Sequence, residues 1–430
     1  MRKKRVVITG VGPISSIGMG QEAFWNGLLN NQDHIREHKE YIGKELWETF
    51  RYHKIENFDI HQFGIDRDKL KRIKDWKEGE ENEDLNYLLA SVKLALDDGK
   101  IKNTNDYRIG LVLAHENIGL MPFGLKISGL AYDMLIGKSA QVLGKKDFYA
   151  VFYEQFIKSG YDVQGFPNLF HVTQTFDIKN FSLFVNNACA SGLYAMETAS
   201  QIIKNDQSDI VITAVSDHSD IYKYVWFKEI GIYSEKGYMS PFSKNADGIL
   251  IGDGAAGVML EDYEHAQKRG AFIYAEYLGG GFDLENWKIT VPQIGSQSYQ
   301  SAIKKALQQS SVAVKDIDVL CAHGVGKKTI DGYESKAITD VFGKNPKDLA
   351  ITAFKGYLGH TLGASALLET IIILLMMKNN KIIASKNCED VDPQHHLRLV
   401  EKTKECQIKT VMKICCPFAG FNAAVLLKKG

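Results

Sequence analysis

The segment that decides the fold is NNACASGLYAMETASQII, which runs from Asn186 to Ile203. An apolar run ends just before it, and a stretch rich in alanine, serine and glycine begins at or just after Cys189. This order predicts a strand, a sharp turn and a helix. At a helix start, free backbone N–H groups and the macrodipole favour a thiolate over a thiol. Cys189 is therefore a candidate nucleophile, although a cysteine among alanines is more often a small core residue.

The alternation of short strands and helices extends over most of the chain and predicts an α/β protein. We expect one series of strands over residues 5–9, 109–114, 183–186 and 209–215. We expect a second series over residues 274–280, 319–322, 350–353, 381–384, 411–415 and 423–428. The two series predict two similar halves, residues 1–262 and 263–430. Residues 36–105 are charged and are expected to be largely helical and peripheral, and the aromatic stretch 121–168 to form a cap or a dimer-facing insertion.

Composition narrows the class of function. The chain has 430 residues, with 52 basic and 52 acidic side chains, so no net charge draws it to nucleic acid or to an anionic membrane. Its six cysteines show no CxxC spacing, and the sequence starts without a secretory pattern, so we expect reduced thiols in the cytoplasm and no metal site. The apolar run 367–377 is shorter than the roughly 20 residues that span a bilayer, and it predicts a buried helix instead.

Three further segments carry candidate functional residues. In CAHGVGKKTIDGYE, His323 follows a β-run on a glycine turn, and Asp331 and Glu334 stand at helical spacing. In KGYLGHTLGASALLET, Lys355 and His360 lie among glycines that allow close backbone approach, ahead of the apolar run. The third segment, CPFAGFNAAVLL, is a turn before the last strand. Taken singly, each is also compatible with an ordinary packing loop.

These segments, in their order and spacing, resemble the signature of the β-ketoacyl-(acyl carrier protein) synthases of the thiolase fold. The opening KRVVITGVGPISSIGMG and the glycine-rich PFSKNADGILIGDGAAGVMLE resemble two more motifs of that family. The resemblance covers nearly the whole chain and is weakest over residues 36–180. It implies a layered α/β/α/β/α sandwich of two βαβαβ-type halves, and a cytoplasmic enzyme.

The resemblance also implies roles for individual residues. Cys189 matches the acylated nucleophile, and His323 and His360 match the pair that handles decarboxylation and the enolate. Lys355 matches the lysine near the second histidine, and the acidic pair Asp331 and Glu334 matches the groups that orient this lysine. Phe418 matches a gating phenylalanine whose backbone N–H joins that of Cys189 in an oxyanion hole.

The implied reaction is decarboxylative Claisen condensation of the acyl group on Cys189 with a malonyl group. No metal or redox cofactor is needed, since the two imidazoles stabilise the enolate, and the substrates are carried on the phosphopantetheine of an acyl carrier protein. The implied partners are that carrier and a second subunit, in a homodimer or a heterodimer with a related ketosynthase-like chain. The alternatives are a non-decarboxylating acyltransferase, a catalytically silent chain-length partner and, from the glycine cluster GILIGDGAAG alone, a nucleotide-binding protein.

The chain departs from the family pattern at two turns. Val325 and Lys327 stand where threonines usually bind the pantetheine arm, so Lys327 and Lys328 are expected to be solvated or to meet a phosphate or an acidic carrier surface. Pro417 and Ala419 replace glycines that flank the gate, and both restrict the backbone beside Phe418. These changes favour a specialised synthase, for example of a polyketide or polyene pathway, over ordinary fatty-acid elongation.

Overall fold

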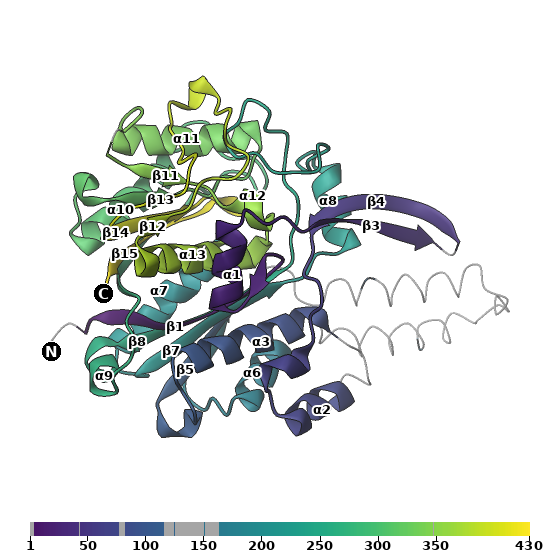
Figure 1. The fold of residues 1–430 in the computed structure, drawn as a ribbon, viewed down its shortest axis with the longest axis vertical. Helices are drawn as coiled ribbons and strands as arrows, with labels where there is room; N and C mark the ends of the chain where they lie inside the picture. The colour runs from purple at the N-terminus through teal and green to yellow at the C-terminus, as the bar shows by residue number, and fades with distance from the viewer. Residues whose placement is uncertain are drawn as a thin grey trace.

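The computed structural model describes residues 4–42, 44–76, 82–115, 163–346 and 348–430, and the single positions 124 and 150. Most of the stretch 121–168 therefore lies outside the described residues. The described chain is built around one large mixed β-sheet with helices on both faces (Figure 1).

The sheet repeats one topology in its two halves. The first half has the order β6-β5-β7-β8-β1, and the second has β11-β10-β14-β15-β9. In each half the first three strands run parallel and the last three antiparallel. The bounds of the first five are β1 (Val6–Ser15), β5 (Ile109–Ala114), β6 (Ser182–Val185), β7 (Ile210–Asp217) and β8 (Gly254–Asp262). Those of the second are β9 (Ala275–Leu284), β10 (Val319–Cys321), β11 (Ala350–Thr352), β14 (Thr410–Cys415) and β15 (Phe421–Lys429).

The halves join where β1 pairs with β9, from Val6↔Tyr277 to Ile8↔Ala275. Helix α9 (Tyr263–Lys268) connects them in sequence. The division into units 1–262 and 263–430 stays a prediction.

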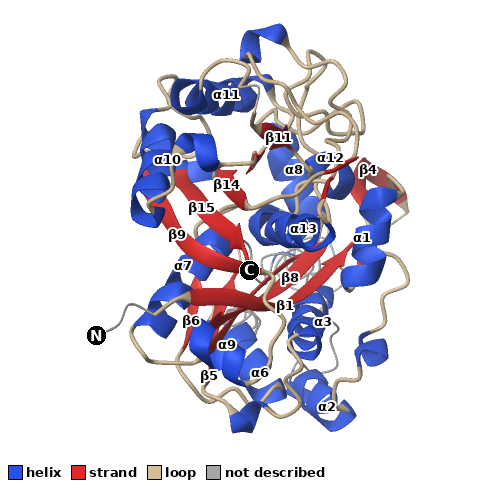
Figure 2. Cartoon of the chain, turned by 60° about the vertical axis from the view of Figure 1, so that its left-hand side comes forward, coloured by secondary structure: helices blue, strands red, loops and turns tan. Residues whose placement is uncertain are grey.

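Two central helices lie between the halves (Figure 2). Helix α7 (Ser191–Lys204) contacts β5, β7 and β15, and α13 (Ser365–Asn379) contacts β8, β14 and α7. The two helices approach so closely that a Cβ added to Gly192 would lie only 2.9 Å from the Cβ of Leu367. Residues 362–379 are apolar and long enough to cross a membrane, but 89% of this segment is buried in the fold. The predicted core helix is thus confirmed.

Outer helices cover the other faces of the sheet. Helix α3 (Glu83–Asp98) packs on β1, β7 and β8, while α10 (Gln297–Ser310) packs on β9 and β15. Helix α11 (Lys328–Phe342) lies against α10. In the first half α6 (Phe166–Thr175) contacts α3 and β6.

Two expectations about secondary structure were wrong. Residues 381–384 give only the two-residue β12 (Lys381–Ile382), which pairs with β13 (Lys404–Glu405) outside the main sheet. Part of the stretch expected to be helical, residues 36–105, is a hairpin of β3 (Ile35–Ile42) and β4 (Glu45–His53). Tertiary packing decides this, because Phe50 stacks on Tyr224 of α8 (Ile221–Glu229) with ring centroids 4.6 Å apart.

For the glycine-rich segment we predicted no secondary structure. It forms β8, which is fully buried between β7 and β1. Glycine is required there because a Cβ on Gly257 would lie 2.6 Å from the carbonyl oxygen of Ser91 in α3. Small residues therefore allow α3 to pack directly on the sheet.

Candidate active site

Cys189 lies on a tight turn between β6 and α7, as its sequence context predicts, and is 3% exposed. The preceding residue, Ala188, has a left-handed φ of 50°, a conformation that costs an L-residue energy and recurs at functional sites. The Ser191 hydroxyl stabilises the turn by accepting from the N–H of Asn187 (2.8 Å) and donating to the carbonyl of Ala188 (2.6 Å).

His323 follows β10 on a loop that two buried carboxylates hold in place. The backbone N–H groups of His323 and Gly324 each donate to Glu334 at 2.7 Å. Those of Val325 and Gly326 donate to Asp331 at 3.2 and 3.1 Å. Burial raises the pKa of Asp331 to about 7.

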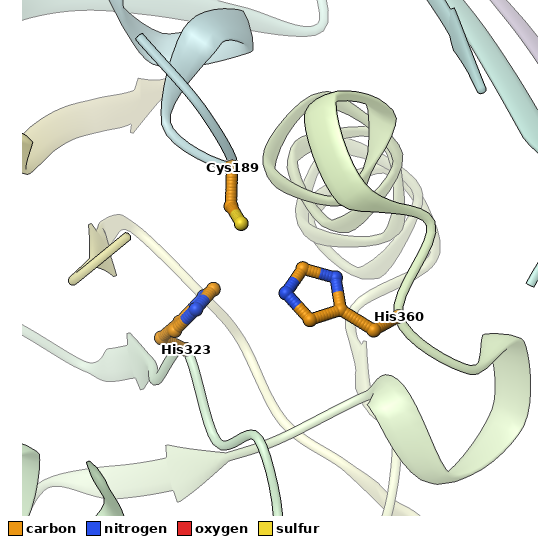
Figure 3. A group of neighbouring side chains, drawn as sticks. All are labelled: Cys189, His323 and His360. Atoms are coloured by element: carbon orange, nitrogen blue, oxygen red, sulfur yellow. The ribbon is translucent and has the colours of Figure 1, made fainter. Parts of the chain in front are cut away.

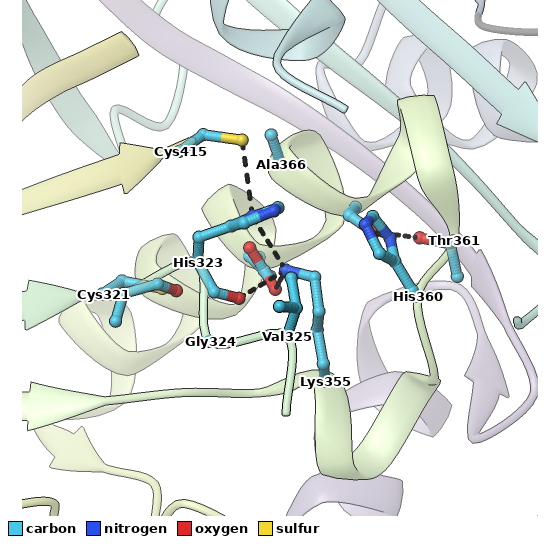
Figure 4. Close-up of polar contacts among 12 residues, drawn as sticks. Cys321, His323, Gly324, Val325, Lys355, His360, Thr361, Ala366 and Cys415 are labelled. Carbon is cyan, nitrogen blue, oxygen red and sulfur yellow. Dashed lines mark hydrogen bonds and ion pairs between the residues drawn. The ribbon is translucent and has the colours of Figure 1, made fainter. Parts of the chain in front are cut away.

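The predicted role of this acidic pair in orienting Lys355 is therefore wrong, because both carboxylates bind backbone N–H groups of the histidine loop. The residue that pairs with Lys355 is Glu369 of α13, 2.7 Å from Nζ. The same ammonium donates to the carbonyl of His323 (2.6 Å) and lies 3.2 Å from its Nδ1 (Figure 4).

Sequence reasoning missed Glu369 and a second lysine. Lys413 of β14 is fully buried, and its Nζ lies 2.5 Å from the other oxygen of Glu369. A signal was present, since each is a lone charge inside an apolar run, and a buried charge requires a partner.

His360 follows the short helix α12 (Lys355–Leu358) and is clamped through its backbone. Its N–H donates to the carbonyl of Leu250 (2.7 Å), and its carbonyl accepts from Gly252 (3.1 Å). Its Nδ1 accepts the N–H of Leu362 at 3.1 Å and lies 2.9 Å from the Ser365 hydroxyl. Leu362 is held at a left-handed φ of 42°.

The tertiary fold brings Cys189, His323 and His360 together from three distant segments (Figure 3). One atom of each lies within 4.8 Å of the others, and the two imidazole rings are 5.5 Å apart at 81°. Burial, and then the charge of Lys355, hold the pKa of both histidines well below the usual value of 6.5. Both rings are therefore neutral at pH 7.

The hydrogen-bond partners of the two rings fix which nitrogen carries the proton. Each Nδ1 faces a donor, the Lys355 ammonium in one case and the Leu362 N–H in the other. Each proton is therefore on Nε2, and both Nε2–H groups are directed at the space beside Cys189. The three residues are close enough to hold a metal ion, but a metal requires an unprotonated nitrogen. The donor set instead favours hydrogen-bond donation to an anion.

A pocket opens at these side chains and is lined by Cys189, both histidines, Val325 and Phe418, among others. Phe418 packs against Trp226 and Phe227 of α8, with ring centroids 5.5 and 6.2 Å away. Next to it, Ala419 has a φ of 57°, and its N–H donates to the carbonyl of Ile289 at 2.6 Å. These contacts hold the backbone beside Phe418 in place, and the role of Phe418 as a gate stays a prediction.

The Lys327 ammonium binds backbone carbonyls of its own chain. It donates to those of Gly231 (2.7 Å) and Asp247 (3.0 Å). Lys327 is thus a half-buried loop anchor, and Lys328 is exposed. That this pair meets a phosphate or an acidic carrier surface stays a prediction.

The sequence of this chain is similar to those of known proteins, and the similarity extends over the residues of this site. Residues 148–266 match the model of the β-ketoacyl synthase N-terminal domain, and residues 274–389 match that of the C-terminal domain. The chain is 26% identical over 438 residues to 3-oxoacyl-[acyl-carrier-protein] synthase 2 of Coxiella burnetii, covering 100% of this chain and 99% of the relative. It is 27% identical over 451 residues to a putative mitochondrial 3-oxoacyl-[acyl-carrier-protein] synthase of Schizosaccharomyces pombe, with 99% of each covered.

Among solved structures, the ishigamide ketosynthase/chain length factor matches with a TM-score of 0.83 and 26% identity, and each chain is covered completely. The predicted thiolase-like fold of the ketosynthases is thereby confirmed.

Proposed function

We propose that this chain, which belongs to the β-ketoacyl synthase family, condenses an acyl group held on Cys189 with a malonyl group on an acyl carrier protein. The product is a β-ketoacyl thioester. The observation that carries the proposal is the pair of neutral imidazoles, each with its Nδ1 facing a donor and its Nε2–H directed at the pocket.

In the first half-reaction the Cys189 thiolate attacks the carbonyl carbon of an acyl thioester. The backbone N–H groups of Cys189 and Phe418 stabilise the oxyanion of the tetrahedral intermediate. Collapse of this intermediate expels the thiolate of the carrier, which takes up a proton, and leaves the acyl group on Cys189.

In the second half-reaction the malonyl thioester loses carbon dioxide. The electron pair of the broken C–C bond moves into the thioester and leaves an enolate oxygen, to which His323 and His360 donate their Nε2–H groups. The enolate carbon then attacks the acyl carbonyl, and the Cys189 thiolate leaves. Both protons stay on the imidazoles, so this step needs donors and no general base.

Two alternatives explain less of the site. A simple acyltransferase has no use for two N–H donors beside the nucleophile, since it forms no enolate. A silent chain-length partner has no use for a nucleophile on a strained turn, and Cys189 is present. One of the similar structures is nevertheless a ketosynthase/chain length factor, which supports a related chain as a partner.

The proposed partners are an acyl carrier protein and a second subunit, identical or related. A cytoplasmic location suits both. The departures at Val325, Lys327 and Pro417 favour a specialised pathway, such as polyketide or polyene synthesis, because the turn after His323 lacks hydroxyl groups at two positions and the backbone beside Phe418 is restrained.

The test uses purified protein, a panel of acyl-carrier proteins and malonyl-carrier protein. Intact mass spectrometry reads the acyl mass on the protein, and carbon dioxide release reads condensation. Wild type should gain an acyl mass on the Cys189 peptide and then release carbon dioxide, while Cys189→Ala should do neither at a comparable rate. Loading without carbon dioxide release from any malonyl donor would instead support the acyltransferase.

A further inference from the structure

We propose that Lys413 is a positioning residue of the condensing site. By binding one oxygen of Glu369, its buried ammonium reserves the other oxygen for Lys355, which then stays against Nδ1 of His323. The inference rests on the proposed function for its catalytic consequence, but its geometry and its spectroscopic test do not depend on condensation.

The first observation is the burial of the pair. Lys413 is 0% and Glu369 is 1% exposed, and their nearest atoms, Nζ and Oε2, are 2.5 Å apart. The Lys413 ammonium also donates to the carbonyl of Ala322 at 3.0 Å, directly before His323. A cation at such a depth costs several kcal/mol of desolvation. It is a poor choice for stability alone, since an apolar residue of similar size often serves as well.

The second observation is the geometry of Glu369, which uses its two oxygens separately. Oε1 binds Lys355 at 2.7 Å, and Oε2 binds Lys413. Lys355 has three hydrogens and three neighbours at hydrogen-bond distance: Glu369 and the carbonyl and Nδ1 of His323. If Lys413 were absent, both carboxylate oxygens would compete for the Lys355 ammonium, and the longest of its contacts, 3.2 Å to Nδ1, would be lost first.

The third observation concerns the other charged or titratable groups that face this cluster. Two thiols lie near the ammonium, Cys321 on β10 and Cys415 on β14, and burial raises the pKa of each to about 12. They are neutral at pH 7, so neither replaces Glu369 as the counter-ion. On α11 Glu334 binds backbone N–H groups of the histidine loop. The positive charge of Lys413 also helps to lower the pKa of both histidines, after burial, Lys355 and, in the case of His323, His360.

The inference can be tested with Lys413→Met, which keeps the approximate length of the side chain and removes its charge. Lys386→Met is the matched control, because Lys386 is also buried (9% exposed) and paired with a carboxylate, that of Asp33 at 3.3 Å. Its ammonium otherwise binds the carbonyls of Asn31 and Gln32 and makes no contact with Glu369. Nitrogen-15 NMR of histidine-labelled protein reads the tautomer of His323, whose signal is assigned from its loss in His323→Ala.

Wild type and Lys386→Met should show His323 protonated on Nε2 alone. In Lys413→Met a fraction protonated on Nδ1 should be present, and condensation should fall about tenfold, as expected for one lost hydrogen bond to a charged group, with acyl loading changed less than about twofold. An unchanged His323 signal in Lys413→Met, or an equal change in Lys386→Met, would overturn the inference. If wild type has the expected tautomer but never condenses, the proposed function fails and this inference stands.

A second comparison applies if Lys413→Met does not fold. Glu369→Gln leaves the Lys413 ammonium without an anionic partner, so adding Lys413→Met to Glu369→Gln should raise the melting temperature. A double variant that melts below Glu369→Gln would show that Lys413 is not paired with Glu369 and would refute the inference.

Discussion

Replacement of His360 by alanine separates the two half-reactions. It removes one Nε2–H donor from the enolate but leaves the turn that holds Cys189, because that turn is built from Asn187, Ala188 and Ser191. Loss of one preorganised oxyanion donor costs about 2.7 to 4 kcal/mol, or about 10²- to 10³-fold in rate. We therefore expect His360→Ala to slow carbon dioxide release by that factor and to slow acylation of Cys189 by less than about tenfold.

The fold should survive the change, at a cost. The Leu362 N–H loses its acceptor, and a buried unsatisfied donor costs about 1 to 3 kcal/mol. His395→Ala is the matched control. Its ring is also buried (8% exposed), lies 2.9 Å from the Ser335 hydroxyl and packs on Phe242 with centroids 5.7 Å apart, all outside the pocket. It should lower stability without changing the ratio of the two rates.

The assay is single-turnover acylation by intact mass, run beside carbon dioxide release from malonyl-carrier protein. Urea denaturation of both variants checks that the fold is retained. If acylation and carbon dioxide release fall in parallel in His360→Ala, the assignment of this histidine to the enolate is wrong, and it acts on the nucleophile instead.

Three other changes probe the same geometry. Ser365→Ala should slow condensation about three- to tenfold, the value of one neutral hydrogen bond, and leave acyl loading unchanged; an unaltered condensation rate would show that the Leu362 N–H alone fixes His360. Ala419→Gly should raise the free energy of unfolding by up to about 1 kcal/mol, because glycine adopts a φ of 57° without strain. The control Ala423→Gly, in β15, should lower it. If urea denaturation shows that both variants lose the same free energy of unfolding, the strain argument is wrong. The nitrogen-15 NMR signals of His323 and His360 should stay those of neutral imidazoles from about pH 8 down to about pH 6, because the pKa of each ring lies well below 6.5. Below about pH 6.5 each of these two histidines should lower the free energy of unfolding by up to about 1.4 kcal/mol per pH unit, because it binds a proton only in the unfolded chain. Asp331, whose pKa is raised to about 7, acts in the opposite direction. Titration of either imidazole near pH 6.5 would refute the neutral-imidazole assignment.

The sequence by itself determined the fold class and the candidate residues at the centre of the site. An apolar strand followed by small residues placed Cys189 at a helix start, a glycine turn after a β-run drew attention to His323, and glycines ahead of an apolar run to His360. These features are local and visible in the sequence, but each alone also fits a packing residue. The order and spacing of the motifs, through the resemblance to the β-ketoacyl synthases, made the three residues candidates. The apolar run 367–377 indicated its core helix for the same reason.

Only the tertiary structure decided which charges meet. Glu369, Lys355 and Lys413 belong to three different elements, and one carboxylate binds both ammonium groups. No local sequence pattern predicts this arrangement. The same holds for Asp331 and Glu334, whose helical spacing was visible but whose partners are backbone N–H groups of another segment. The hairpin of β3 and β4 depends on its packing against α8. In each case the free energy that decides the contact comes from burying a charge, a polar group or an aromatic face against a segment that is distant in the sequence. No local sequence pattern therefore predicts the contact.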